Sequence, residues 1–387
     1  MDGAFRPLKC SAFLAASPPE SPLPVSYPQK YVVLQHSAII FIYLTGNRLK
    51  SIFVSDNGFE KHPLSLGMNV FASLWAAFLL TVTVPSDDSL RVMFWNLENF
   101  FDYRNGAVNT SDEEFSARGA RHWTQRRFQT KCNAVAKGIL WAGSQEGGLP
   151  DVIGLAEIEN AFVLRRLLQT TALWKLDYQI VHFDSPDPRG IDVGLLYRRS
   201  RLQLMDAKPC HLYGPDSTIM ATRDILLARF LSAERRDVVF LVNHHPSKYG
   251  GAEESEGRRR IAVERLRFLA DSLWSLGVRC QVAMGDFNDT PDNPVYMLLE
   301  PTLHNLATPL HQKGLGSIKY DGEWELIDLY FVSDGLSSSA MKILQIPFLM
   351  TEDSGHAGTK PLRTYSGPRY LGGVSDHCPI WVSLYRP

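Results

Sequence analysis

Met284-Gly285-Asp286-Phe287-Asn288 is the stretch that decides how this 387-residue chain is interpreted. An apolar run precedes it and a turn-forming run, Asp289-Thr290-Pro291-Asp292, follows it. The pattern predicts a buried strand that delivers Asp286 and Asn288 into a loop at its C-terminal end. Residues two apart on an extended strand point to the same side, so we expect both side chains to hold one water molecule or one hard cation. Taken alone, the stretch is equally typical of an ordinary turn.

A second motif, Ser375-Asp376-His377, stands just before an apolar strand near the C-terminus. A histidine titrates near neutral pH and can serve there as a general acid or as a donor to phosphate. Because adjacent side chains on a strand diverge, Asp376 is a poor partner for His377. Asp328 lies inside another apolar run, where a carboxylate is costly to bury unless it is paired. We therefore expect Asp328 to orient His377; a turn acid at the start of a strand is the alternative.

Three further predicted strands end in polar groups. Their last residues are Asn96, Glu157 and the pair Asn243-His244. One such strand end is a common cap or turn, but polar groups at the ends of so many core strands indicate a ring around a single cleft. We expect the two motifs described above to belong to the same ring.

The complete set of motifs, in chain order, is Trp95-Asn96-Leu97-Glu98-Asn99, Leu155-Ala156-Glu157, Thr222-Arg223-Asp224, Asn243-His244, Gly285-Asp286-Phe287-Asn288, Ile327-Asp328 and Ser375-Asp376-His377. In this order the motifs resemble those of the endonuclease/exonuclease/phosphatase superfamily, the DNase-I-like phosphohydrolases. The Gly-Asp-Phe-Asn and Ser-Asp-His elements are specific when they occur together at this separation, whereas either one alone is weak. The resemblance implies an α+β fold, a four-layer αββα sandwich of two mostly antiparallel sheets with helices outside. It places the active site in loops at one end of the sheets.

The resemblance also implies hydrolysis of a phosphoester, which needs a cation to neutralise developing charge and a water in line with the leaving group. Hard oxygen ligands without cysteine suit Mg²⁺ or Mn²⁺ better than zinc. We expect Glu157 to hold this metal with support from Asn96, and Asp376 to lie beside it. Asp286 would orient or deprotonate the attacking water, and Asn288 would fix the position of the water or of the phosphate.

The remaining implied roles concern the substrate phosphate. His244 would face it as a second histidine, with Asp192 as a candidate partner, although Asp192 is equally typical of a loop cap. Arg223 would make a bidentate phosphate contact that lysine could not copy. The alternative for Arg223 is a surface salt bridge with Asp224. The other candidates of this group are His377, oriented by Asp328, as a donor to a phosphate oxygen, and Asn243 as a substrate contact.

The rest of the chain from residue 90 to residue 387 predicts one domain with two amphipathic helices. Apolar runs at 180–183, 193–197 and 225–230 predict strands, and segments 184–190 and 351–373 predict loops. The apolar face of the helix over 123–141 consists of Phe128, Cys132, Val135 and Ile139. The apolar face of the helix over 255–276 consists of Ala262, Leu266, Leu269, Leu273 and Leu276.

The composition limits the substrate. The formal net charge is −1 and the pI is about 6.8, whereas a protein that grips long DNA non-specifically usually carries a basic excess. This balance favours smaller or surface-presented phosphoesters. A basic-aromatic patch at the start of the first helix is compatible with guiding a polyanion, but a solvated face is its default interpretation. The patch consists of Trp123, Arg126, Arg127 and Lys131.

The N-terminal part of the chain differs from the rest in composition. Residues 1–67 are rich in proline and serine without a clear period, and predict a disordered tail or an extension upstream of a true start at Met68. The apolar run 70–84 is short for a membrane span and suits the hydrophobic region of a signal peptide. Segment 68–88 therefore predicts export, to the periplasm or by secretion. The lack of basic residues after Met68 counts against a signal peptide, and a cytoplasmic protein with an apolar helix is the alternative.

Two classes of function follow from the sequence. The first is a metal-dependent phosphoric ester hydrolase, acting as a monomer on a nucleic acid, a sugar phosphate or a lipid head group, with no protein partner implied. Within it the motifs favour a phosphodiesterase or nuclease; a phosphomonoesterase or a phospholipid phosphodiesterase is the alternative. The second is a non-catalytic binding protein that retains the fold, which loss of Glu157, Asp286 or His377 would indicate; none is lost. Five scattered cysteines imply no disulfide framework.

Overall fold

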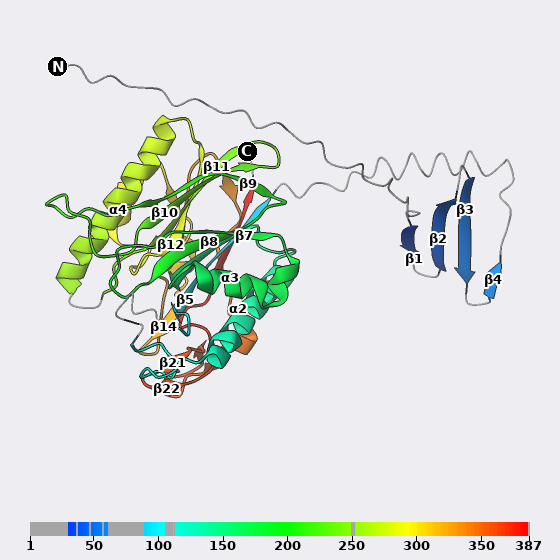
Figure 1. Ribbon diagram of the computed structural model, residues 1–387. Coiled ribbons are helices and arrows are strands. Elements are labelled where there is room, and N and C mark those ends of the chain that lie inside the picture. The colour runs from blue at the N-terminus through cyan, green and yellow to red at the C-terminus, as the bar shows by residue number, and fades with distance from the viewer. Residues whose placement is uncertain are drawn as a thin grey trace, which may run out of the picture. The chain divides into compact units, whose positions relative to one another are not determined.

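The computed structural model describes residues 30–35, 38–45, 48–55, 58–60, 89–104, 111, 113–248 and 252–385. The chain divides into two units, Met1–Ser86 and Asp87–Pro387. The first unit contains an antiparallel meander of four strands paired in chain order (Figure 1). These strands are β1 (Lys30–Gln35), β2 (Ala38–Thr45), β3 (Arg48–Ser55) and β4 (Gly58–Glu60). The disordered tail or upstream extension that the sequence suggests for residues 1–67 stays a prediction.

The prediction of export from the apolar run 70–84 is corrected. That run lies outside the described residues. No helix in the described part of the chain is long and apolar enough to cross a membrane. The run itself is shorter than a membrane span, and a length suited to a signal peptide is insufficient to show one. We therefore withdraw export as a conclusion.

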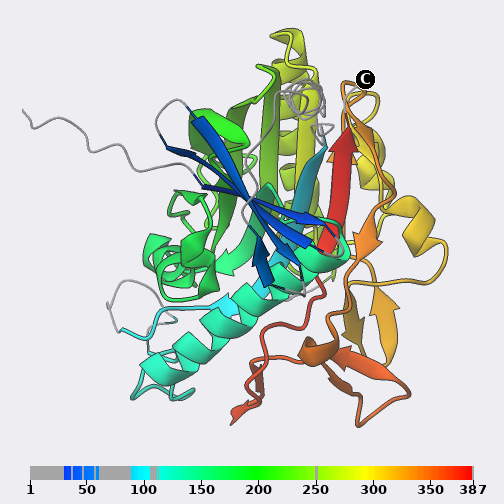
Figure 2. The same cartoon turned by 90° about the vertical axis from the view of Figure 1, so that its right-hand side faces the viewer.

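The first sheet of the second unit consists of β5 (Leu90–Phe100), β6 (Val152–Ile158), β7 (Tyr178–His182), β8 (Asp192–Arg198), β17 (Ser337–Ser338), β18 (Lys342–Ile343) and β23 (Ile380–Tyr385). Their order is β17-β23-β5-β6-β8-β7, with β18 also paired to β23. Only β5 and β6 run parallel, and every other pair is antiparallel. β23 lies beside β5, so strands from the two ends of this unit are neighbours (Figure 2).

The second sheet consists of β9 (Leu202–Cys210), β10 (Ile225–Ser232), β11 (Asp237–His244), β12 (Cys280–Asp286), β13 (His304–Asn305) and β16 (Asp328–Val332). Their order is β13-β16-β12-β11-β10-β9, and only β11 and β12 run parallel. In this pair Asn243 lies opposite Gly285, and a Cβ at Gly285 would stand 2.2 Å from the Asn243 carbonyl oxygen. Glycine is therefore required for the two strands to approach this closely.

Three longer helices cover the outer faces of the two sheets (Figure 1). They are α2 (Gln125–Gln145), α3 (Ala161–Gln169) and α4 (Ala252–Ser275). The Thr124 side chain caps α2 by accepting from the Arg127 backbone N–H at 3.3 Å, which satisfies one orphan donor of the first turn. The predicted apolar face of α2 is fully buried. In the second predicted helix Leu276 is 80% exposed, because α4 ends before it at Ser275.

Two hydrophobic cores give the layer order. Along β5, Val92 and Phe94 pack in the core between the sheets, while Met93 and Trp95 pack under α2 and α3. This alternation is the two-residue period of a strand buried on both faces. The Tyr330 hydroxyl of β16 donates to the Val92 carbonyl at 3.1 Å, and so joins one sheet to the other. The layers are thus helix, sheet, sheet, helix, and the predicted αββα sandwich of mostly antiparallel sheets is confirmed.

Short elements fill the connections. The segment 351–373, predicted as a loop, contributes strands to two short hairpins, β19–β20 and β21–β22. The short elements are η1 (Ala172–Lys175), η2 (Pro294–Leu298), α5 (Thr308–His311), β14 (Ile318–Tyr320), β15 (Glu323–Glu325), η3 (Pro347–Leu349), β19 (Met350–Glu352), β20 (Thr359–Pro361), β21 (Tyr365–Ser366) and β22 (Arg369–Tyr370).

Candidate active site

Polar strand ends from both sheets meet at one point, as the ring of motifs predicts. Asn96 of β5 donates from Nδ2 to Oδ2 of Asp286, at the end of β12, over 2.9 Å. Nε2 of His377, just before β23, lies 3.8 Å from the same oxygen. His244, at the end of β11, brings its Nε2 to 3.7 Å from it. Asp286 is therefore the common neighbour of three side chains contributed by different strands.

His377 and Asp328 are brought together as predicted. Nδ1 of His377 and Oδ2 of Asp328 are 2.7 Å apart, and both side chains are buried. The Ser317 hydroxyl donates to the same Asp328 oxygen. Burial alone would lower the pKa of His377, but Asp328 and then Asp286 raise that pKa well above its ordinary value. The two carboxylates therefore favour the protonated form of His377, whose Nε2 faces Oδ2 of Asp286 at 3.8 Å. These three residues, Asp286, Asp328 and His377, form what we call the proton cluster.

The loop before β23 is fixed by its own hydroxyl group. The Ser375 side chain donates to the Asn96 carbonyl at 2.6 Å and accepts from the His377 backbone N–H at 2.9 Å. The Trp95 indole N–H donates to the His377 carbonyl at 2.9 Å. The histidine is therefore positioned from β5 on its backbone side and from Asp328 on its ring side.

Asp286 and Asn288 do not share one direction, which corrects the expectation of an extended strand through both. β12 ends at Asp286, and Asn288 has a φ of +51° in the left-handed region. The Asn288 backbone N–H donates to Oδ1 of Asp286 at 2.9 Å, whereas its side-chain Nδ2 donates to the His245 carbonyl at 3.0 Å. Asn288 thus supports Asp286 through its backbone. Burial raises the pKa of Asp286 to about 7, although His377 lowers it.

A second group of acids, Glu98, Glu157 and Asp376, forms what we call the carboxylate cluster. Arg363 joins two of its members: its Nε donates to Oε1 of Glu98 at 2.8 Å, and its Nη2 lies 3.2 Å from Oδ2 of Asp376. Oε2 of Glu157 accepts from the Asn99 backbone N–H at 2.7 Å. Burial and then the charge of Asp376 raise the pKa of Glu98 to about 7. Negative charge is therefore concentrated here beyond what Arg363 offsets.

Backbone in the left-handed region sets the direction of the Glu98 and Glu157 side chains. Glu98, Asn99 and Glu157 have φ values of +43°, +53° and +58°. The pairing of β5 with β6 shifts register between Asn96 and Phe100. Such bulges redirect side chains at strand ends and recur beside functional sites. Glu98 enters the site from this irregular strand end; the sequence placed it in the Trp95–Asn99 motif but gave it no role. Glu159 stays outside, because its Oε2 accepts from the Asp102 backbone N–H at 2.6 Å.

Lys131 is a further site residue that sequence reasoning missed. The helical patch at 123–131 was expected to be solvated, but Lys131 and Trp123 are both fully buried. Nζ of Lys131 donates to the Glu98 carbonyl at 2.6 Å and to the Thr364 hydroxyl at 2.8 Å. Burial lowers the pKa of Lys131 to about 8, against the charges of Glu98 and Glu157. The ammonium group is therefore a buried counter-charge behind the carboxylate cluster.

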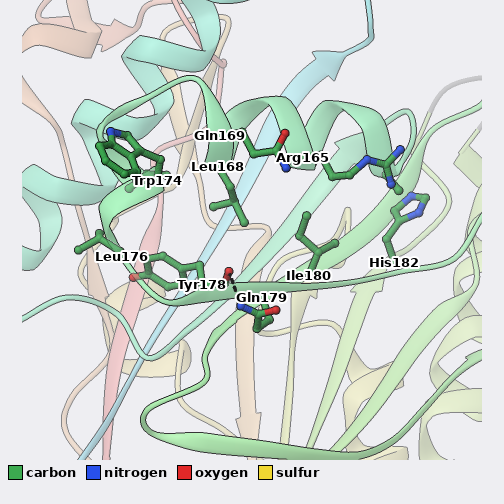
Figure 3. Close-up of a pocket in the computed structure, with 11 residues that line it drawn as sticks. Arg165, Leu168, Gln169, Trp174, Leu176, Tyr178, Gln179, Ile180 and His182 are labelled. Carbon is green, nitrogen blue, oxygen red and sulfur yellow. Dashed lines mark hydrogen bonds between the residues drawn. The ribbon is translucent and has the colours of Figure 1, made fainter. Parts of the chain in front are cut away.

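The proposed pairing of Asp192 with His244 is not found, which is a second correction. Asp192 lies 3.1 Å from Nε2 of His182 and accepts from the Ser185 backbone N–H at 2.9 Å. Nδ1 of His244 has no hydrogen-bond partner among the described residues. His182 lines a cavity of about 770 Å³ between α3 and β7, where it points toward Arg165 (Figure 3). Asp192 therefore fixes a loop, the alternative that the sequence left open.

Arg223 and Asn243 are held by protein groups. Nη1 of Arg223 donates to Oδ2 of Asp187 at 2.9 Å, and its Nη2 donates to the His245 carbonyl at 2.7 Å. The alternative, a salt bridge between Arg223 and Asp224, is not found among the described residues, because Oδ1 of Asp224 pairs with Nδ1 of His211 at 2.8 Å. Asn243 is fully buried and donates to the Leu241 carbonyl at 2.8 Å. Both side chains support the strand end that carries His244, and Arg223 also lines a cavity together with Asp187 and Arg189.

A family model described as the endonuclease/exonuclease/phosphatase family matches residues 91–386. The chain belongs to this family. The match spans the whole sandwich from β5 to β23, and so includes both clusters. No curated protein matches the chain.

Solved structures agree with the family in fold. The human nocturnin catalytic domain with bound sulfate anion is 17% identical, with a TM-score of 0.51 over 78% of this chain and 95% of that one. An endonuclease/exonuclease/phosphatase family protein from Bacteroides thetaiotaomicron is 15% identical, with a TM-score of 0.50 over 77% and 98%. TDP2 from Caenorhabditis elegans is 14% identical, with a TM-score of 0.50 over 82% of each chain. At these identities the likeness shows the fold alone.

The family implies a divalent metal, and the carboxylate cluster fits one. Its donors are carboxylate oxygens, which hard cations such as Mg²⁺ and Mn²⁺ prefer. The side chains of Glu157 and Asp376 are 15% and 21% exposed, so an ion can reach them from solvent. The proton cluster also has ligand atoms within 4.8 Å of one another. There, however, the Nδ1 of His377 is already bonded to Asp328. Both clusters therefore offer carboxylate oxygens to a divalent cation, and the proton cluster is the one whose ligand atoms lie within 4.8 Å of one another.

Proposed function

We propose that the chain is a divalent-metal-dependent hydrolase of phosphodiester bonds. The observation that carries the proposal is that the proton cluster contains both a proton acceptor and a hydrogen-bond donor. Asp286 has a pKa of about 7 and can accept a proton, while His377 has a raised pKa and can donate a hydrogen bond. A base and a donor that face each other beside a cation site are the groups that phosphoryl transfer to water requires.

In the proposed reaction a water oxygen attacks phosphorus while the bond from phosphorus to the leaving oxygen breaks, and the leaving alkoxide takes a proton from solvent. Asp286 accepts the proton of the attacking water, in a position that Asn96 and the Asn288 backbone N–H fix. His377, held by Asp328, donates to a non-bridging phosphate oxygen. Mg²⁺ or Mn²⁺ would be held by Glu157 and Asp376, with Asn96 in support, and would neutralise the developing charge.

The test is a substrate panel with the purified full chain. It contains a chromogenic phosphodiester, a dinucleoside monophosphate, plasmid DNA, RNA, sugar and inositol phosphates and sphingomyelin, each with Mg²⁺, Mn²⁺ or EDTA. We expect diester cleavage that EDTA abolishes. Asp286→Asn should abolish it as well, and Asp206→Asn, at an exposed carboxylate of β9, is the matched control. Turnover of monoesters alone would replace the proposal with a phosphatase, and metal-independent turnover would contradict it.

A further inference from the structure

The first sheet of the second unit ends in a strand with an open outer edge. β7 is the last strand of that sheet and, among the described residues, it pairs with β8 alone. Just before β7, the Arg199 backbone N–H donates to the Asp177 carbonyl at 3.2 Å. Because bonded and non-bonded pairs alternate along an antiparallel ladder, the backbone groups of Gln179 and Val181 also point toward β8. The backbone groups of the other residues of β7 therefore point outward.

The outward groups belong to Tyr178, Ile180 and His182. The Tyr178 carbonyl accepts from the Gln179 side chain at 3.2 Å. The backbone N–H and C=O groups of Ile180 and His182 have no protein partner among the described residues. Unpaired groups on a strand edge are a template for pairing with another extended chain.

A cavity of about 770 Å³ lies along this edge, where α3 and η1 stand beside β7 (Figure 3). The three residues with outward backbone groups all line it. Trp174, which is 65% exposed, lies at one end of the cavity, and Arg165 lies near His182 at the other end (Figure 3). Between these ends the lining includes Leu168 and Ile180. The edge of β7 is therefore accompanied by space for side chains along its length.

The chemistry of the lining selects the occupant. Arg165 is exposed, and none of the described lining residues carries a carboxylate. Lys175 adds a second exposed cation, with its Nζ 5.7 Å from the centre of the Trp174 ring. The exposed carboxylate of Asp184 follows β7 outside the lining, so the cationic side is that of α3 and η1. An acidic side chain is complementary to this side, and backbone groups repeated at every second residue match another main chain.

We propose that β7 and this cavity bind an extended segment of a partner protein, in which acidic and apolar residues alternate. The segment adds one strand to the first sheet by pairing with the outward groups of Ile180 and His182. Its apolar side chains pack on Trp174, an exposed aromatic anchor, and an acidic side chain pairs with Arg165. The surface is separate from the proton cluster and the carboxylate cluster, and the inference does not rest on the proposed function.

Peptide selection on the full chain tests the proposal. The probe is a displayed library of short peptides in which apolar and acidic residues alternate. We expect enriched peptides whose affinity for Ile180→Pro is about fivefold lower than for Ile180→Ala, because proline removes the outward N–H and leaves the bonds to β8. Both variants lose the Ile180 side chain, so this comparison isolates the hydrogen bond. Thermal unfolding confirms that both are folded.

Two further comparisons test the anchor and the pairing. Trp174→Ala should weaken binding at least about tenfold, and Phe268→Ala, at a 61% exposed aromatic residue of α4, is the control and should bind like the wild type. N-methylation of alternate peptide amides tests the pairing without changing the protein. One set of methylated amides should weaken binding at least about tenfold and the other set should not, because only alternate amides of an added strand face β7.

Three results would overturn the inference. The first is failure to enrich any peptide. The second is an affinity of the enriched peptides that neither Trp174→Ala nor Ile180→Pro changes, or that both methylated sets retain. The third is a dimer of the full chain that forms with rising concentration, dissociates in Ile180→Pro and leaves the peptides unbound, which would assign the edge to a second copy of this chain.

Discussion

The proton cluster and the carboxylate cluster lie side by side and are built in opposite ways. Asp286 and Asp328 are opposite one another on neighbouring antiparallel strands, and short hydrogen bonds already satisfy much of the group. Glu98 and Glu157 of the carboxylate cluster stand on left-handed backbone, and Arg363 and Lys131 offset only part of the charge of its three acids. The first arrangement fixes protons in place, and the second stores unbalanced charge where a cation can enter.

This difference teaches that position and charge are supplied by separate parts of the fold. Regular strands fix the positions of Asp286 and Asp328 in the proton cluster, because the register of the sheet sets the direction of each side chain. The irregular ends of β5 and β6 lose that regularity and place Glu98 and Glu157 together, while Asp376 comes from the loop before β23. Changes in the first cluster should therefore act on turnover, and changes in the second should act on metal binding.

The largest effect is expected for Asp286→Asn. The amide keeps the shape of the side chain but cannot accept the proton of the attacking water, so kcat should fall roughly 10³-fold. Steady-state kinetics on a chromogenic diester measure this, with Asp206→Asn expected to match the wild type. A kcat within about tenfold of the wild type would show that Asp286 is not the base.

Asp328→Asn should lower kcat about 10²-fold and change the pH profile. In the wild type the rate should rise as the pH increases through about 7, because burial raises the pKa of Asp286 to that value and its carboxylate must be ionised. The rate should fall again at high pH, when His377 loses its proton. Without the Asp328 charge the pKa of His377 drops, so this alkaline limb moves to lower pH. If the alkaline limb of the pH profile does not move, Asp328 does not set the pKa of His377.

A smaller effect is expected for Arg363→Met. The half-exposed guanidinium offsets Glu98 and Asp376, and its removal leaves more negative charge for a cation. Mn²⁺ should bind more tightly, by about fivefold at most, because solvent screens an exposed pair. Isothermal titration measures the change, and Arg363→Lys, which keeps the charge, should lie close to the wild type. Weaker binding in Arg363→Met would mean that Arg363 positions the carboxylates and does not compete with the ion.

The smallest effect on turnover is expected for Asp192→Asn. Its carboxylate bonds to His182 and Ser185, outside both clusters, so kcat should stay within about threefold of the wild type. The free energy of unfolding should fall by about 1–3 kcal/mol, because buried hydrogen bonds are lost. Thermal unfolding and kinetics on one sample check both statements. A large loss of kcat with full stability would restore the link to His244 that the sequence suggested.

How much was predictable from sequence follows the same division. The layered fold, the meeting of strand ends and the contact of Asp328 with His377 all follow from strand patterns, because regular strands transmit side-chain direction. Asn288 was misplaced because the strand stops at Asp286 and the chain turns left-handed two residues later. Glu98 was included in the Trp95–Asn99 motif but was given no role, because its direction depends on the irregular end of β5. Motif order and strand alternation carry no information about a local bulge.

Contacts between residues far apart in the sequence were the other limit on prediction. Lys131 lies in a helix with basic neighbours and resembles a solvated residue, yet its ammonium group is buried against a carbonyl of β5. Arg363 comes from a connection without a motif. By chemical type Asp192 was assigned to His244, and Arg223 to a phosphate or to Asp224, whereas the fold pairs them with His182 and Asp187. Charge pairing across hundreds of positions depends on loop geometry that periodicity does not encode.

The most direct test of the account is isothermal titration of Mn²⁺ into the full-length Asp286→Asn variant. The account predicts an affinity within about threefold of the wild type in a protein that has lost turnover, since metal and proton are handled by separate clusters. Glu157→Gln, titrated alongside, should lose most of the binding. Loss of Mn²⁺ binding in Asp286→Asn, with binding retained in Glu157→Gln, would contradict the account and make Asp286, Asp328 and His377 the metal site.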